Sequence, residues 1–134
     1  MRIVIDTNRI VAATIIDGMS RKILFSENFE FFSPEYTTTE INEHKKEIME
    51  KTDLNETEFD FLVSIILEKI RLIPFDEYKN FIEESKNLIK DLDDVPFLAL
   101  CLTLRTDGIW TDDEHFMKQN KIKIFRTSDM IKLL

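Results

Sequence analysis

An uninterrupted apolar run at the start of the chain constrains the fold more than any other stretch of the sequence. Residues 3–5 are Ile, Val and Ile, and the polar triplet Asp-Thr-Asn at 6–8 ends the run. Strands that are covered on both faces of a parallel sheet have such runs, without polar alternation. The apolar residues of 10–16 then predict a helix, which the polar triplet would cap. Strand, turn and helix in this order predict the first unit of a parallel α/β sheet.

Asp6 is the first candidate functional residue because of where the predicted strand ends. In open parallel sheets, ligands bind beyond the carboxyl ends of the strands. The sequence places Asp6 at this point. A carboxylate there can also do no more than cap the following helix. Both interpretations of Asp6 stay open when the triplet is considered alone.

Length and composition predict one globular domain that spans residues 1–134. The chain is 43% hydrophobic and 33% charged, as in ordinary globular proteins. No apolar run is long enough for a membrane span, and no signal peptide is recognisable. Cys101, the single cysteine, lies in an apolar stretch, so we expect a buried thiol in a reducing compartment. These features together predict a cytoplasmic protein.

The formal net charge of −8 argues against an extended basic surface for nucleic acid. It does not exclude nucleic-acid binding, because carboxylates that surround a bound cation add negative charge without repelling phosphate. The distribution of charge therefore matters more than its sum.

The rest of the chain alternates between helical and strand patterns. Ser33 and Pro34 predict the cap and first turn of a helix, and Thr127 is the expected cap of the last helix. This alternation predicts an α/β fold, a doubly wound sandwich of about five parallel strands. The other strands are expected at 29–32, 71–74, 108–110 and 122–125, and the other helices at 20–26, 33–51, 55–70, 75–90, from 93 or 94 onward, at 115–116 and at 127–134.

Three further acids join Asp6 as candidate site residues. Asp113 follows the predicted strand 108–110, as Asp6 follows the first strand. Asp94 stands at the start of an apolar helix, where Asp91 and Asp93 are near enough to share its role. Glu40 lies on one helical face with Tyr36 and His44, and a solvated surface acid is the alternative interpretation.

A doubly wound sheet gathers strand and helix ends along one edge, so these acids are expected to converge there. Clustered carboxylates require a counter-charge, and hard oxygen ligands favour magnesium or manganese. The two histidines, His44 and His115, do not favour a histidine mechanism, because no serine or cysteine nucleophile stands at a recognisable turn. A zinc site would require closer ligand spacing.

Four motifs, in this order and spacing, resemble those of the PIN-domain family of metal-dependent ribonucleases. They are the segments Ile-Asp-Thr-Asn at 5–8, Thr-Thr-Thr-Glu-Ile at 37–41, Asp-Asp-Val-Pro-Phe-Leu-Ala-Leu at 93–100, and Trp-Thr-Asp-Asp-Glu-His-Phe at 110–116. The resemblance extends over the whole chain. It implies a five-stranded parallel sheet in the order 3-2-1-4-5, a magnesium or manganese site and cleavage of RNA. Many relatives are VapC-type toxins, commonly dimeric, so it also implies an antitoxin partner and a homodimer.

By this resemblance, Asp6, Asp94 and Asp113 are metal ligands and Glu40 completes the acidic pocket. Asn8 and Thr111 offer side chains that orient carboxylates or water. Arg9 departs from the apolar residue expected in the family, and it either contacts phosphate or is simply solvated. The expected phosphate contacts are Arg9, Lys45, Lys46 and Lys118.

Two other classes of protein are compatible with parts of this pattern. A catalytically silent PIN scaffold would bind RNA or protein without cleaving it, although all four acids are present. A phosphoacceptor receiver domain would need an aspartate after the third strand and a lysine after the fifth, where Pro74 and Arg126 stand. The apolar stripe from Phe59 to Ile70 either packs in the core or contacts a second subunit.

Overall fold

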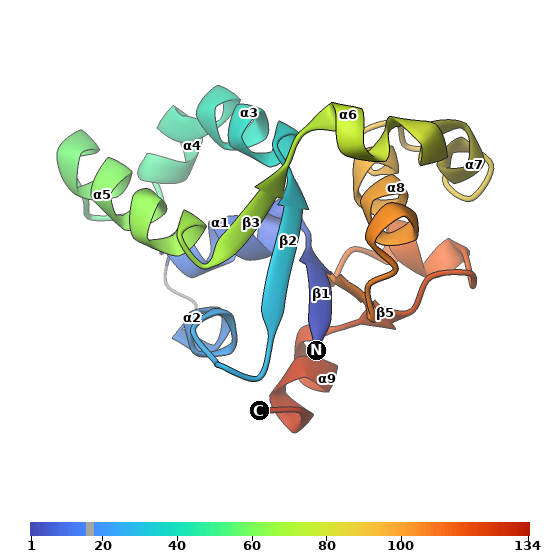
Figure 1. Ribbon diagram of the computed structural model, residues 1–134. Helices are drawn as coiled ribbons and strands as arrows, with labels where there is room; N and C mark the ends of the chain where they lie inside the picture. Colours follow the sequence, from blue (N-terminus) through green and yellow to red (C-terminus); the bar gives the residue numbers. More distant parts are fainter. Residues whose placement is uncertain (16–17) are drawn as a thin grey trace.

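The computed structural model describes residues 1–15 and 18–134. Within these residues, five strands form one parallel sheet in the order β3-β2-β1-β4-β5 (Figure 1). This order confirms the predicted one, and it differs from the 2-1-3-4-5 order of receiver domains. The strands are β1 (Arg2–Ile5), β2 (Glu30–Pro34), β3 (Ile70–Ile73), β4 (Gly108–Trp110) and β5 (Ile124–Phe125).

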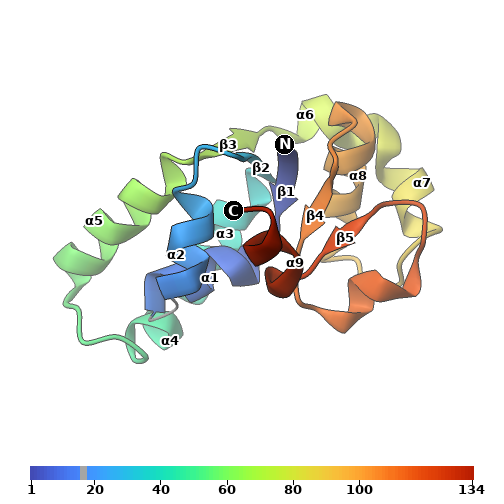
Figure 2. The same cartoon turned by 90° about the horizontal axis from the view of Figure 1, so that it is seen from below.

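Helices cover both faces of the sheet. Figures 1 and 2 show α1, α2 and α5 on one face and α6, α7 and α8 on the other. The helices are α1 (Thr7–Ile15), α2 (Gly18–Leu24), α3 (Tyr36–Glu43), α4 (Lys45–Met49), α5 (Glu56–Leu67), α6 (Phe75–Tyr78), α7 (Ile82–Lys86), α8 (Val95–Leu104) and α9 (Thr127–Lys132), with 3₁₀ turns η1 (Lys79–Phe81) and η2 (Glu114–Lys118).

The apolar run of β1 contributes to two separate hydrophobic clusters. Ile3 and Ile5 pack with residues of α1, α2 and α5, whereas Val4 packs on the opposite face with residues of α8. Side chains alternate between the faces of a strand, so both faces of β1 must be apolar. This confirms the interpretation of the opening run as a strand covered on both sides.

The carboxyl ends of β1 and β4 lie side by side. Ile5 is in register with Trp110, and the backbone N–H of Asp6 donates to the carbonyl of Trp110 at 3.1 Å. Asp6 and Thr111 therefore leave the sheet at the same point. Since α8 leads the chain back to the beginning of β4, its N-terminus, at Asp94, lies toward the same edge.

The predicted helix 33–51 was wrong at its start and in its continuity. Ser33 and Pro34 belong to β2, because the Ser33 hydroxyl donates to the carbonyl of Ile5 at 3.2 Å inside the sheet and does not cap a helix. The helix begins at Tyr36 instead. At His44 the backbone leaves helical geometry (φ −105°, ψ 11°), which separates α3 from α4.

Other boundaries also differ from the predictions. The helix predicted at 75–90 is divided into α6, η1 and α7, and Ile70 starts β3 instead of ending a helix. Helix α1 begins at Thr7, and the predicted helix end at Ile16 lies outside the described residues. Strand β5 is shorter than predicted, and the N-cap of α9 is Arg126, because the Thr127 hydroxyl bonds elsewhere.

Several predictions of local structure are confirmed. Helix α5 begins at Glu56, directly after its N-cap Asn55 and close to the predicted start at 55, and α8 begins directly after Asp94. The Cys101 thiol is buried. Among the residues that the structure describes, no helix is long and apolar enough to cross a bilayer.

Candidate active site

Asp6 and Thr111 form the centre of the site, where β1 and β4 end. Asp6 is only 6% exposed, and its Oδ2 accepts a hydrogen bond of 2.8 Å from the Thr111 hydroxyl. The same hydroxyl accepts the backbone N–H of Asp113 at 3.0 Å. Thr111 is fully buried, and its hydroxyl thus holds Asp6 and the backbone of Asp113 close together. The backbone N–H of Asn8 also contacts the Asp6 carboxylate.

Asp113 and Asp94 reach the site from two connections of the chain. Asp113 lies in the connection that follows β4, and Asp94 lies at the end of the connection that precedes α8. The Asp113 Oδ1 accepts the backbone N–H of His115 at 2.9 Å and so caps η2. The Asp94 side chain is 13% exposed and makes no capping hydrogen bond to α8. Its Oδ2 is buried and has no hydrogen-bond partner among the described residues. A buried carboxylate oxygen without a donor is costly unless a cation or another ligand contacts it.

Glu40 reaches the site from α3. Its Oε1 accepts a hydrogen bond of 2.8 Å from the Thr7 hydroxyl, which also contacts the Thr37 hydroxyl. Glu40 is half-buried and therefore is not the solvated surface acid of the alternative interpretation. The hydroxyl of Tyr36, one turn earlier, donates to Asp93 at 2.9 Å. This face of α3 is therefore turned toward the segment 91–94 that precedes α8.

Burial and the charges of neighbouring acids raise the pKa values of Asp6, Glu40 and Asp94. The pKa of Asp94 is raised to about 7, mainly by burial and in part by the charges of Asp91, Asp113 and Asp6. Burial, together with the charge of Asp6, raises the pKa of Glu40. The pKa of Asp6 is also raised, mainly by burial and in part by Asp113. Carboxylates held together in this way fit a divalent cation, which supplies the missing counter-charge and accepts oxygen ligands.

A protein-family model described as a PIN domain matches residues 4–130. The chain belongs to the PIN-domain family. This match agrees with the sheet order and with the acids at the carboxyl edge of the sheet. PIN domains are generally nucleases. A comparison with curated proteins finds no match for the chain.

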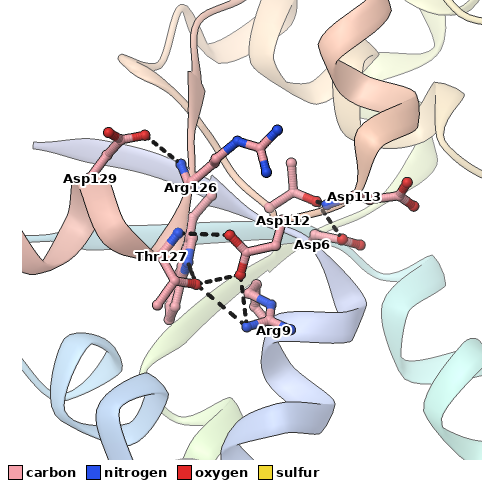
Figure 3. Close-up of polar contacts among 9 residues, drawn as sticks. Asp6, Arg9, Asp112, Asp113, Arg126, Thr127 and Asp129 are labelled. Carbon is pink, nitrogen blue, oxygen red and sulfur yellow. Dashed lines mark hydrogen bonds and ion pairs between the residues drawn. The ribbon is translucent and has the colours of Figure 1, made fainter.

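In this PIN domain a second polar network, not expected from the sequence, joins Asp112, Thr127 and Arg9 next to Asp113 (Figure 3). Asp112 accepts hydrogen bonds from the backbone N–H and hydroxyl of Thr127, at 2.9 and 2.5 Å. It also pairs with Arg9 at 3.0 Å. The Trp110 indole donates to the Thr127 hydroxyl at 3.0 Å. This network ties the end of β4 to α1 and α9, and no local pattern could reveal it because its partners are far apart in sequence.

The lysines predicted to contact phosphate occupy different surroundings in the PIN domain. Lys45, on α4, pairs with Glu56 at 3.0 Å and Asp60 at 2.8 Å on α5. Lys46 borders a separate hollow between α4 and the start of α5. Lys118 lies much nearer the acids, in a hollow of about 520 Å³ that is also lined by Lys86, Lys90, Asp91 and His115.

Of the three acids before α8, Asp94 is the most buried and the nearest to the centre of the PIN-domain site. Asp93 is exposed and accepts the Tyr36 hydroxyl. Asp91 is exposed and faces His115 across 3.9 Å. The sequence did not favour a histidine mechanism, but in the structure the His115 ring lies beside the carboxylates of Asp91, Asp94 and Asp113.

Proposed function

We propose that the protein is a metal-dependent endoribonuclease that hydrolyses RNA phosphodiester bonds, with Mg²⁺ or Mn²⁺ as its cofactor. The observation that supports this most strongly is the buried Asp94 Oδ2, which lies in a cluster with Asp6 and Asp113 and has no hydrogen-bond partner within residues 1–15 and 18–134. Membership of the PIN-domain family supports a nuclease, and the oxygen-rich site supports a hard divalent cation.

In this proposal Asp6, Asp94 and Asp113 hold the cation, and Glu40 completes the acidic pocket. A divalent cation bound there would supply an activated water and stabilise the charge on the departing oxygen. Thr111 keeps Asp6 oriented through its 2.8 Å hydrogen bond. Asn8 contributes its backbone N–H to the same carboxylate.

The hollow beside the acids supports a path for the RNA strand. Lys118, Lys86 and Lys90 line it together with His115, which lies 3.8 Å from Asp94. These cations can hold phosphate groups next to the scissile bond, so binding of RNA should weaken as salt rises. Arg9, Lys45 and Lys46 are the other proposed phosphate contacts, although Arg9 and Lys45 already pair with acids of the protein.

The proposal is tested by cleavage of a mixed-sequence, single-stranded RNA by wild type, Asp6→Asn and Asp76→Asn. The matched control Asp76 lies on α6, where its exposed carboxylate pairs with Lys79 at 3.4 Å. Asparagine at position 6 can still accept the Thr111 hydroxyl, so we expect Asp6→Asn to fold. It lacks the charge that holds the cation, so we expect its rate to fall by orders of magnitude.

Each protein is assayed with manganese, with magnesium and with a chelator. The proposal requires that wild type and Asp76→Asn cleave with metal and that the chelator stops both. Equal cleavage by Asp6→Asn would identify a contaminating nuclease. If folded wild type cleaves none of a varied set of RNAs, the silent scaffold that only binds RNA or protein becomes the better account.

We further propose that the protein is the toxin of a type II toxin–antitoxin pair and forms a homodimer. Membership of the PIN-domain family supports both the toxin role and the homodimer. A small reading frame beside the gene, whose product copurifies with this chain and inhibits cleavage, would identify the antitoxin. A folded chain that cleaves RNA but has no such neighbour would contradict the toxin role alone.

A further inference from the structure

His115 lies among carboxylates that come from two different connections of the fold. Its Nδ1 is 3.8 Å from Asp94 Oδ2 and 3.9 Å from Asp91 Oδ2. One ligand atom from each of these three residues lies within 4.8 Å of the other two. Two ligands that are each about 2.1 Å from a metal ion are roughly 3.4 Å apart in a tetrahedral site and roughly 4.2 Å apart when they stand opposite each other. The separations from Nδ1 therefore suit three atoms that share one cation.

The local hydrogen bonds leave the three ligand atoms available. Asp91 accepts the backbone N–H of Asp93 with Oδ1 and keeps Oδ2 for the cluster. Asp94 Oδ2 is buried without a hydrogen-bond partner among the described residues. The backbone N–H of His115 donates to Asp113, which holds the beginning of η2 against the acids. The buried Asp94 oxygen is an observation separate from the clustering of the acids.

An entry path and free coordination positions are also present. The hollow of about 520 Å³ is lined by both Asp91 and His115, so a cation and its waters can reach the cluster from solvent. Three protein ligands leave at least one position of a tetrahedral ion for water. A structural site that encloses its metal would need a fourth protein ligand.

We propose that His115, Asp91 and Asp94 form a second cation position, adjoining the one at Asp6, which takes a zinc-class transition metal (Zn²⁺, Co²⁺ or Ni²⁺) in preference to Mg²⁺. An imidazole nitrogen is a poor ligand for magnesium and a good one for these metals. This inference rests on the proposed function in that the two positions share Asp94. Divalent nucleases commonly use paired ions about 3.5–4 Å apart, so a shared carboxylate is chemically reasonable.

The two histidines of the chain make a direct test possible. In protein labelled with ¹⁵N at histidine, His115 and His44 give two sets of ring nitrogen resonances. His44 is a matched internal control, because it is exposed, pairs with Glu47 at 3.5 Å and does not belong to the cluster of His115, Asp91 and Asp94. We expect Zn²⁺ to shift the Nδ1 resonance of His115 at about one equivalent and to leave His44 unchanged. We expect Mg²⁺ to shift neither ring strongly.

Affinity measurements by calorimetry complete the test. His115→Ala should weaken Zn²⁺ binding at least about tenfold and leave Mg²⁺ affinity nearly unchanged, since even outer residues of metal sites affect affinity this much. His44→Ala should bind Zn²⁺ as wild type does. Equal shifts of both rings, or unchanged Zn²⁺ affinity in His115→Ala, would overturn the proposal.

The variant Asp6→Asn separates this inference from the proposed function. Its His115 resonance should still shift with Zn²⁺ even though RNA cleavage is lost, because Asp6 is not a ligand of the second position. If Zn²⁺ shifts His115 in a wild-type protein that cleaves no RNA, the metal position stands and the nuclease proposal fails. If RNA is cleaved and His115 does not respond to Zn²⁺, only the second position is disproved.

Discussion

Asp94 combines three conditions that seldom occur at one side chain of a soluble protein. It is mostly buried, it is close to other acids, and its Oδ2 has no donor among the described residues. Each condition disfavours the charged form, and together they raise the pKa of Asp94 to about 7. A bound cation would therefore stabilise the charged form of Asp94 strongly at neutral pH.

This pKa shift sets the sign of a pH effect on stability. The folded-state pKa lies above the ordinary value of 3.8, so the folded protein binds the proton more tightly than the unfolded chain. The stabilising contribution is therefore complete at acid pH and is lost as pH rises through about 7. With chelator present, we expect Asp94→Asn to be more stable than wild type at pH 8, by roughly 1–3 kcal/mol, and to lose this advantage at pH 4.

Urea unfolding of wild type, Asp94→Asn and the exposed control Asp76→Asn at both pH values measures this difference. Asp76→Asn should follow wild type at each pH. An Asp94→Asn variant less stable than wild type at pH 8 in chelator would show that this carboxylate is not under electrostatic strain.

At the scale of residues, the sequence predicted the acids but not their neighbours. Asp6 and Asp113 follow apolar strands, and such a pattern can be read locally. The contact of Asp112 with Thr127 joins residues 15 positions apart, across the end of the sheet. The approach of His115 to Asp91 likewise depends on how two connections pack. Sequence patterns show which face a residue occupies, but not which distant residue it meets.

At the scale of elements, strands were predicted better than helix boundaries. The strand 108–110 was confirmed because its apolar run is covered on both faces. The helix predicted at 33–51 failed because a serine and a proline suit a strand end as well as a helix start. The Ser33 hydroxyl bonds to β1, a tertiary contact that no local signal reports.

Gly108, at the start of β4, allows a close approach between neighbouring strands. A Cβ atom there would contact the carbonyl of Lys123 and come within 2.7 Å of the Phe125 ring. We expect Gly108→Ala to lower the free energy of unfolding by about 1–3 kcal/mol, because the strands must separate. Gly18 has open space around its Cβ position, so Gly18→Ala is the matched control.

Thermal and urea denaturation of both glycine variants tests this packing. Gly18→Ala should change stability by less than about 1 kcal/mol. Equal stability of the two variants would mean that β4 and β5 do not approach as closely as described.

At the scale of the whole molecule, α5 divides its apolar stripe between two surroundings. Phe59 and Ile66 are buried in the core, as one interpretation of the stripe required. Phe61 is 68% exposed, beside the partly buried Leu62 and Ile65. An exposed aromatic in such a setting is available for the proposed subunit contact.

We therefore expect a dimeric mass by light scattering at micromolar concentration and a monomeric mass for Phe61→Ser. Replacing Phe61 should not reduce the melting temperature of the fold by itself, because its side chain is outside the core. Leu92→Ser is a matched control, since Leu92 is 67% exposed and lies before α8, away from α5. A monomeric wild type would contradict the homodimer.

Part of the negative charge of the molecule lies at the carboxyl edge of the sheet. Acids from the ends of β1 and β4, from α3 and from the start of α8 gather at one edge of the sheet, and lysines line the hollow beside them. A net charge of −8 is therefore compatible with an RNA substrate once a cation is bound. The proposed nuclease activity therefore depends on that cation.

Calorimetric titration of Mn²⁺ into wild type, Asp6→Asn/Asp94→Asn and Asp76→Asn tests this dependence most directly. We expect wild type and Asp76→Asn to give the same binding heat and the double variant to give none. Bound Mn²⁺ should also raise the melting temperature of the first two proteins, because only the folded chain assembles the site. The same heat from all three proteins would contradict the account, since the acids at the edge of the sheet would then not be the metal site.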